Sequence, residues 1–141
     1  MAVNAWDVAD IDNDGSKELL MGDTSNSGGT YSGHVVAYDA DLNQKWQTQD
    51  IGGIEAINVS NIDGTGTPEI PLGLTTSEDS GTYSGMLMVL DKDGNLLWNT
   101  TDIGSAVIVM TGDVDGDSKL EIVVAAMEYD DGMGTVTTTI H

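Results

Sequence analysis

The stretch Asp10-Ile-Asp-Asn-Asp-Gly-Ser-Lys-Glu18 places four carboxylates within nine residues, and related stretches occur twice more along the chain. The second is Asn61-Ile-Asp-Gly-Thr-Gly-Thr-Pro-Glu69, and the third is Asp113-Val-Asp-Gly-Asp-Ser-Lys-Leu-Glu121. Their first residues, 10, 61 and 113, are 51 and 52 positions apart. A fixed period of this length is typical of repeat architectures, in which each repeat forms one structural unit. These stretches are called the first, second and third loops below.

The segments between the loops follow the same period. Three landmarks recur 52 positions apart: Gly29-Thr-Tyr-Ser-Gly33 with Gly81-Thr-Tyr-Ser-Gly85, Trp46 with Trp98, and Ile51-Gly52 with Ile103-Gly104. We therefore expect one repetitive β region with units at about residues 1–52, 53–104 and 105–141, the last of them incomplete. A third tryptophan at the repeat position of Trp46 and Trp98 would fall near residue 150, beyond His141.

Each unit contains short runs rich in Val, Ile, Leu and Thr that are separated by Gly, Asp and Asn, which is a β-strand pattern. The expected strands are 5–9, 18–22, 33–38 and 44–48 in the first unit, 54–60, 69–74, 85–90 and 96–100 in the second, and 106–111 and 121–127 in the third. Four short strands in a unit of this length match one blade of a β-propeller. The sequence thus predicts an all-β fold of four-stranded propeller-type blades, with about two and three-quarter blades visible.

That number of blades is too small for a ring, because propellers have at least about four. An open stack would leave apolar faces and strand edges bare. We therefore expect the chain to be part of a larger propeller, or to assemble with copies of itself into a ring or a filament.

The charge balance excludes several classes of partner. The chain carries 24 acidic residues against four lysines, a formal net charge of −20, and it has no cysteine. Nucleic acid and anionic membrane surfaces need Lys and Arg, so neither is expected as a partner. No apolar run is long enough to insert into a membrane. Bound calcium would neutralise part of this charge; a surface adapted to high salt is a compatible explanation.

The loops have the ligand spacing of a calcium site. Calcium takes six to eight hard oxygen ligands at about 2.3–2.6 Å, and a tight loop supplies them from alternate side chains and a backbone carbonyl. Positions 1, 3, 5 and 9 offer side chains and position 7 a carbonyl. The predicted ligands are Asp10, Asp12, Asp14, Ser16 and Glu18 in the first loop, and Asp113, Asp115, Asp117, Lys119 and Glu121 in the third.

The second loop keeps only two carboxylates among its predicted ligands, which are Asn61, Asp63, Thr65, Thr67 and Glu69. Because calcium affinity follows ligand charge, we expect two strong sites and one that is weaker or empty. Ordinary Asp-Gly turns on an acidic surface are the alternative. An EF-hand is excluded by the β flanks and by Met21, Leu72 and Val124 at position 12, where that motif has glutamate.

The loop together with the Glu-Leu-Leu or Glu-Ile-Val that follows it resembles the FG-GAP repeats of integrin-α-like β-propellers. The resemblance covers all three units and implies calcium loops between neighbouring strands of each blade. It also implies an extracellular or cell-surface protein used for adhesion, scaffolding or carbohydrate contact. Some related propellers are polysaccharide lyases.

The tryptophans, His34 and two asparagines have either a structural or a functional interpretation. We expect Trp46 and Trp98 to pack between blades, with sugar stacking as the alternative, and Trp6 to pack in a core. His34 is expected to be structural. Asn58-Val-Ser60 and Asn99-Thr-Thr101 are possible glycan acceptors, Asn99 being the better candidate.

These observations predict a calcium-stabilised structural or adhesion module that contacts proteins, glycans or copies of itself. A self-assembling extracellular filament subunit is one alternative. A polysaccharide lyase or hydrolase is another, although the lack of arginine argues against a lyase. No catalytic residue is identified.

Overall fold

The computed structural model describes residues 1–101, 103–130 and 133–140, and the regular elements of this part of the chain are all β-strands. They are β1 (Ala2–Ala9), β2 (Glu18–Ser27), β3 (Thr30–Ser32), β4 (Val35–Tyr38), β5 (Gln44–Gln47), β6 (Gly53–Ile57), β7 (Ile70–Asp79), β8 (Thr82–Leu90), β9 (Leu96–Thr101), β10 (Ser105–Gly112), β11 (Glu121–Asp130) and β12 (Met133–Ile140). No helix in the described residues is long and apolar enough to cross a membrane.

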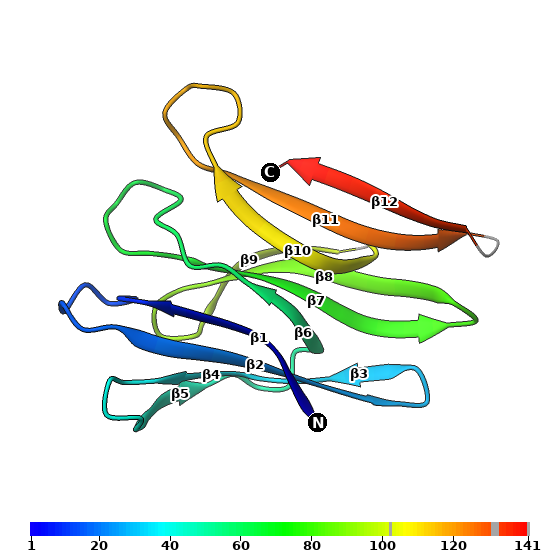
Figure 1. Ribbon diagram of the computed structural model, residues 1–141, viewed down its shortest axis with the longest axis horizontal. Coiled ribbons are helices and arrows are strands. Elements are labelled where there is room, and N and C mark those ends of the chain that lie inside the picture. The colour runs from blue at the N-terminus through cyan, green and yellow to red at the C-terminus, as the bar shows by residue number, and fades with distance from the viewer. Residues whose placement is uncertain (102, 131–132, 141) are drawn as a thin grey trace.

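The strands form antiparallel sheets in which each main strand pairs with the next one along the chain (Figure 1). The first sheet has the order β1-β2-β4-β5, the second β6-β7-β8-β9 and the third β10-β11-β12. Strand β3 pairs with the end of β2, and its Thr30 pairs with Ser77 of β7, so the first two sheets are continuous through β3. This curled, all-β arrangement confirms the predicted fold class and corresponds to part of a β-propeller.

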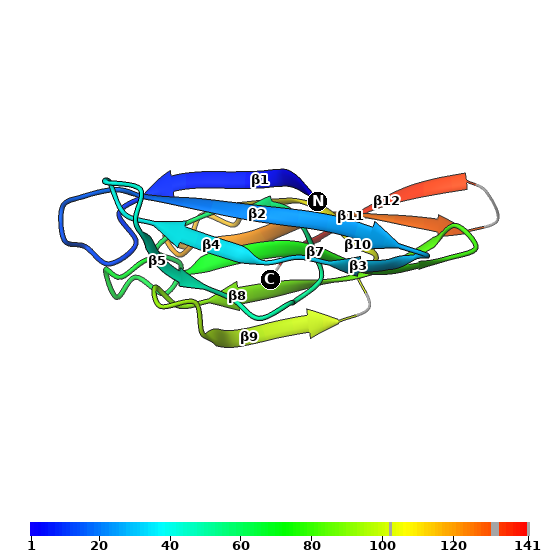
Figure 2. The ribbon, with the colours of Figure 1, turned by 90° about the horizontal axis from the view of Figure 1, so that it is seen from below.

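Two hydrophobic cores lie between the sheets, which stack face to face (Figures 1 and 2). The core between the first and second sheets contains buried Ala5, Ile11, Leu20, Val35, Ala37, Ile54, Ile70, Leu72, Leu74, Met88 and Leu90. The core between the second and third contains Leu87, Val89, Val109, Ile122 and Val124. Successive side chains of a strand point to opposite faces, so β8 supplies Met88 to one core and Leu87 to the other. The middle sheet is therefore buried on both faces.

The recurring Gly-Thr-Tyr-Ser-Gly segment has a steric reason. A Cβ atom on Gly33 would lie 2.1 Å from the carbonyl oxygen of Asp23 and 2.7 Å from that of Gly52. A Cβ atom on Gly85 would lie 2.1 Å from the Gly104 oxygen in the matching place. The segment that leads to the next sheet thus passes directly over Gly33, just before β4, and over Gly85 in β8, and only glycine fits at these two positions.

Two expectations are corrected. Trp6 does not pack in a core: it is 69% exposed, because strand alternation turns its neighbour Ala5 toward the second sheet and Trp6 away from it. Strands β2 and β7 extend to Ser27 and Asp79, well beyond the predicted ends at residues 22 and 74. Their polar extensions resemble loops in sequence, but they pair with β3 and with the start of β8.

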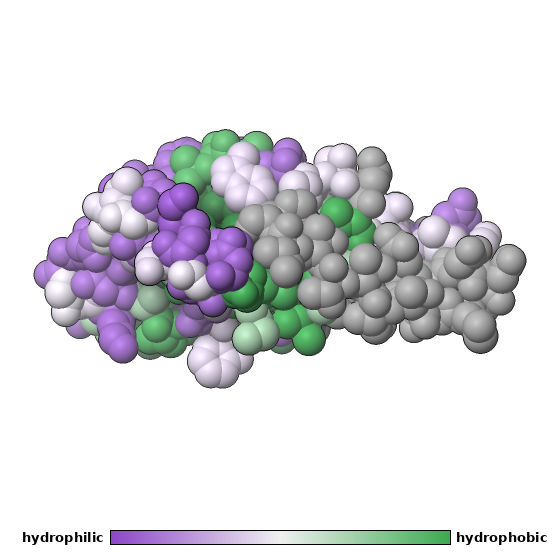
Figure 3. Space-filling view, turned by 90° about the horizontal axis from the view of Figure 1, so that it is seen from above, coloured by the Kyte–Doolittle hydropathy of each residue, from purple (hydrophilic) through white to green (hydrophobic). Residues whose placement is uncertain are grey.

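The three loops project from one end of the stack, beside one another (left in Figure 1). The Asn13 side-chain amide donates a hydrogen bond to the Gly66 carbonyl, so the first loop touches the second. Hydrophilic residues gather at the same end of the molecule, whereas hydrophobic residues are visible nearer its middle (Figure 3). The fold thus concentrates acidic side chains at one edge of the propeller segment.

Candidate metal centres in the acidic loops

All three loops have the same backbone conformation at two positions. The φ angles at position 4 are 60° for Asn13, 72° for Gly64 and 84° for Gly116, and those at position 6 are 90° for Gly15, 98° for Gly66 and 72° for Ser118. Left-handed backbone is uncommon for residues other than glycine. The loops keep this shape even where Asn13 and Ser118 replace glycine, which indicates that side chains within each loop hold it.

In the first loop, backbone amides turn the carboxylates inward. The Asp10 carboxylate accepts hydrogen bonds from Asp14 N at 3.1 Å and Gly15 N at 2.9 Å. Glu18 Oε2 accepts one from Ile11 N at 3.0 Å, and the Glu18 side chain is only 1% exposed. One oxygen from each of Asp10, Asp12 and Glu18 lies within 4.8 Å of the other two. The loop therefore brings three carboxylates from its two ends to one centre.

The third loop repeats this arrangement in a more exposed setting. The Asp113 carboxylate accepts hydrogen bonds from Gly116 N at 2.6 Å and Ser118 N at 2.9 Å, and Glu121 Oε2 accepts one from Val114 N at 2.9 Å. Oxygens of Asp113, Asp115 and Glu121 lie within 4.8 Å of one another. Positions 1, 3 and 9 thus converge in both loops.

These two groups fit a calcium ion by their chemistry, since they offer hard carboxylate oxygens without nitrogen or sulfur. The position-5 residues lie outside the two groups. Asp14 Oδ1 accepts a hydrogen bond from Ser16 N at 2.7 Å, and Asp117 Oδ1 accepts one from Lys119 N at 2.9 Å. The roles of these aspartates, and of the position-7 carbonyls, as metal ligands stay predictions.

The second loop has the same framework with less charge. Asn61 Oδ1 accepts a hydrogen bond from Gly66 N at 3.1 Å, and Glu69 Oε2 accepts one from Ile62 N at 2.7 Å. Hydrogen bonds from the Thr65 backbone amide, and to a smaller extent from the Thr65 hydroxyl group, lower the pKa of Asp63. The described residues of this loop do not form a group of three carboxylates. Its weaker calcium binding, or lack of it, remains a prediction.

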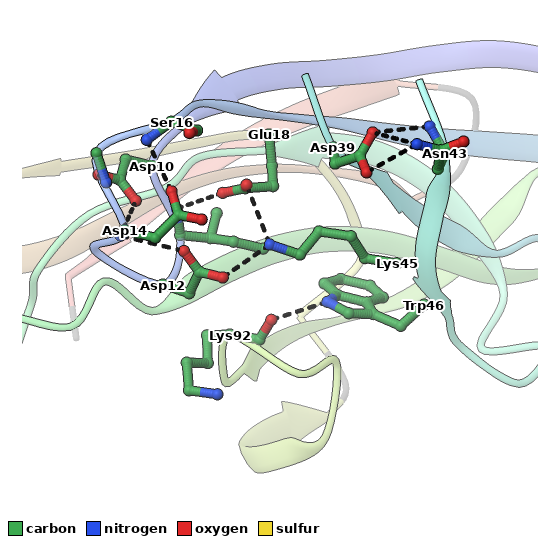
Figure 4. Close-up of polar contacts among 12 residues, drawn as sticks. Asp10, Asp12, Asp14, Ser16, Glu18, Asp39, Asn43, Lys45, Trp46 and Lys92 are labelled. Atoms are coloured by element: carbon green, nitrogen blue, oxygen red, sulfur yellow. Dashed lines mark hydrogen bonds and ion pairs between the residues drawn. The ribbon is translucent and has the colours of Figure 1, made fainter. Parts of the chain in front are cut away.

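A cation that the sequence analysis missed lies in the first loop. Lys45, on β5, places its Nζ atom 2.7 Å from Asp12 Oδ2 and 3.1 Å from Glu18 Oε1 (Figure 4). The hydrogen bond to Asp12, with a further contribution from Glu18, raises the pKa of Lys45, and the same contact lowers the pKa of Asp12. A comparison of the repeat units could have pointed to Lys45, since the equivalent position in the second unit is the uncharged Leu97.

Trp46 joins neighbouring sheets, which confirms the packing interpretation for this residue. Its Nε1 atom donates a hydrogen bond to the Lys92 carbonyl at 2.8 Å in the turn between β8 and β9 (Figure 4). A Cβ atom on Gly94 would lie 2.8 Å from the Trp46 ring, so the ring lies flush against that turn. Trp98, at the matching position, is 41% exposed.

The two possible glycan acceptors differ in their surroundings. Asn58 is half-buried and its Oδ1 atom accepts hydrogen bonds from Ser60 Oγ at 2.9 Å and Thr111 Oγ1 at 3.0 Å, whereas Asn99 is exposed on β9. Glycosylation at either stays a prediction.

Comparison with known proteins identifies the third unit. The family model described as "FG-GAP repeat" matches residues 105–138, which include β10, the third loop and β11. A search among curated proteins finds no match. The segment from residue 105 to residue 138 therefore matches an FG-GAP repeat, and the sheets stacked on it have a fold consistent with part of a β-propeller.

Proposed function

We propose that the chain is a calcium-stabilised propeller module that works outside the cell or at the cell surface. The observation that carries the proposal is the convergence of three carboxylates within 4.8 Å in the first loop and again in the third. The proposed ions would bind to Asp10, Asp12 and Glu18, and to Asp113, Asp115 and Glu121.

The bracing effect follows from the position of these residues in the strands. Asp113 comes directly after β10 and Glu121 begins β11, so an ion held by both fixes the register of two paired strands. Like charges at this separation repel by roughly 1 kcal/mol per pair in water, and by more in a less polar site. A divalent cation replaces that repulsion with attraction. It also removes part of the chain's net charge of −20.

An extracellular location suits such sites, because extracellular calcium modules bind with dissociation constants of about 10⁻⁴–10⁻³ M. The exposure of the loops at one edge leaves the rest of the module free to contact a protein or a glycan. We propose a structural or adhesive role on this basis.

The test is thermal unfolding, monitored by circular dichroism, with calcium in excess and with a chelator. We expect the chelator to lower the melting temperature markedly. Equal melting temperatures in the two conditions would refute the proposal. Magnesium and sodium chloride at matched ionic strength serve as controls, because a surface merely adapted to salt would respond to any of these ions.

Self-association is a second candidate function, favoured by apolar side chains that remain uncovered. They lie on β1, β9 and β10 and include Trp6, Val8, Leu96, Leu97, Ile108 and Met110, each at least 45% exposed. Contiguous exposed apolar surface is typical of an interface, and Trp6 and Ile108 border one hollow where β1, β6 and β10 meet. We propose that further blades cover it, either from the same polypeptide or from other copies. Sedimentation in calcium and in chelator distinguishes a monomer from a ring or a filament.

A further inference from the structure

We propose that Lys45 is a built-in cation of the first loop, which competes with calcium there and makes the first site weaker than the third. The inference rests on the proposed calcium binding and concerns how the two sites differ. In this account the first sheet stays braced without metal, whereas the third loop depends on it.

The contacts of Lys45 show that it engages the same carboxylates that a metal would use. Its ammonium group bonds to Asp12 and Glu18, two of the three residues that converge in the first loop (Figure 4). The third member, Asp10, accepts hydrogen bonds from backbone amides of the loop instead.

Glu18 gives the ion pair its importance. Its side chain is 1% exposed, and a buried carboxylate without a partner destabilises a fold strongly. The backbone amide of Ile11 supplies one donor and Lys45 supplies the charge. Because Lys45 lies on β5 and Glu18 begins β2, the pair also links the last strand of the first sheet to its calcium loop.

The second and third loops differ from the first in this respect, as far as the described residues show. The second unit has Leu97 at the position of Lys45. In the third loop, the Lys119 ammonium lies 3.5 Å from Asp117, a residue outside the converging group, and its side chain is 80% exposed. Among the residues that the structure describes, no lysine pairs with Asp113, Asp115 or Glu121. The first and third loops thus share a carboxylate geometry and differ in one internal cation.

Calcium must therefore displace an ammonium group from the first loop but not from the third. The lysine stem has four flexible carbons, so Lys45 can withdraw toward solvent when a divalent ion enters. This exchange reduces the apparent affinity of the first site. It also couples calcium binding to release of the tie between β5 and the loop.

The experiment measures calcium binding by isothermal titration calorimetry in a chain carrying Asp115→Asn, which disables the third loop. Added to this background, Lys45→Gln is expected to tighten binding at the first loop by about tenfold, equivalent to about 1.4 kcal/mol. Lys17→Gln is the matched control: it removes the same charge from a residue of the first loop itself, but Lys17 is exposed and outside the carboxylate group. We expect it to change the affinity by less than about twofold.

A second readout needs no calcium. In chelator, Lys45→Gln should lower the melting temperature, because Glu18 loses its counter-charge, and Lys17→Gln should not. Lys45→Met, which imitates the apolar residue of the second unit, should behave as Lys45→Gln does.

The outcomes separate the two proposals. Calcium binding at both loops of the unmodified chain, with Lys45→Gln and Lys17→Gln indistinguishable in affinity and in melting, would overturn the role of Lys45 and leave the proposed function standing. Absence of calcium binding to the unmodified chain would overturn both.

Discussion

Asp115→Asn in the third loop is the substitution whose effect can be worked out most fully from the structure. Asp115 is one of three carboxylates within 4.8 Å of each other, and its Oδ1 atom accepts a hydrogen bond from Asp117 N at 3.1 Å. An asparagine side chain keeps that acceptor and nearly the same shape, so the turn survives. The substitution therefore removes one negative charge from the site and changes little else.

The expected magnitude follows from binding linkage. Calcium at about 100 times its dissociation constant stabilises the folded state by about 2.7 kcal/mol per site. For a chain of this length, 1 kcal/mol corresponds to roughly 3–4 °C in melting temperature. Loss of the third site should therefore lower the melting temperature in calcium by about 8–11 °C. In chelator the variant should melt at or slightly above the temperature of the unmodified chain, because a repulsive charge is gone.

Differential scanning calorimetry in calcium and in chelator gives both values, and Asp63→Asn is the matched control. Asp63 occupies the same position in the second loop, and its Oδ1 atom accepts the equivalent hydrogen bond from Thr65 N at 2.8 Å. We expect it to lower the melting temperature in calcium by less than about 2 °C. Equal losses for the two variants, or no loss for Asp115→Asn, would refute the assignment of a strong site to the third loop.

Three further predictions concern the frame around the loops. Gly85→Ala should destabilise the fold by about 2–3 kcal/mol in denaturant titration, because its Cβ atom would meet backbone oxygens at 2.1 and 2.2 Å, whereas Gly112→Ala, with open space around it, should cost less than about 0.5 kcal/mol. Trp46→Ala should lower stability by about 3 kcal/mol in the same assay, since it removes both packing and a hydrogen bond between sheets, and a loss below about 1 kcal/mol would contradict that role. Hydrogen bonds from the Asn43 side-chain amide, and to a smaller extent from the Asn43 backbone amide, lower the pKa of Asp39 below the usual 3.8. The ionised Asp39 carboxylate therefore stabilises the fold above pH 3.8, and this contribution is lost as the pH falls through the lowered pKa. In chelator, Asp39→Asn should therefore be less stable than the unmodified chain at neutral pH and should converge with it in acid; a constant difference at all pH values would contradict this origin.

Much of the fold could be predicted because the repeat carries it. The strand segments 33–38 and 85–90 each begin with glycine and lie one period apart, and the period alone divides the chain into units. The hairpin extensions of β2 and β7 could not be predicted, since their Ser, Thr and Asn residues are equally common in loops. Trp6 was misassigned because an aromatic residue in a strand does not reveal which face of that strand is covered.

The candidate site was predictable in its ligands and not in its cation. The spacing of Asp10, Asp12 and Glu18 follows from local loop geometry, which a short stretch of sequence encodes. Lys45 reaches the loop from a strand 27 residues beyond Glu18, and the pairing of β2 with β4 and of β4 with β5 brings it there. Long-range register of this kind depends on the assembled sheet.

A crystal structure of the chain grown with calcium in excess tests the central claim most directly. We expect density for an ion at the carboxylate centre of the third loop, with ligand oxygens at about 2.3–2.6 Å, and for a second ion in the first loop with Lys45 withdrawn. Ordered water alone at both centres would contradict the claim that these loops bind calcium.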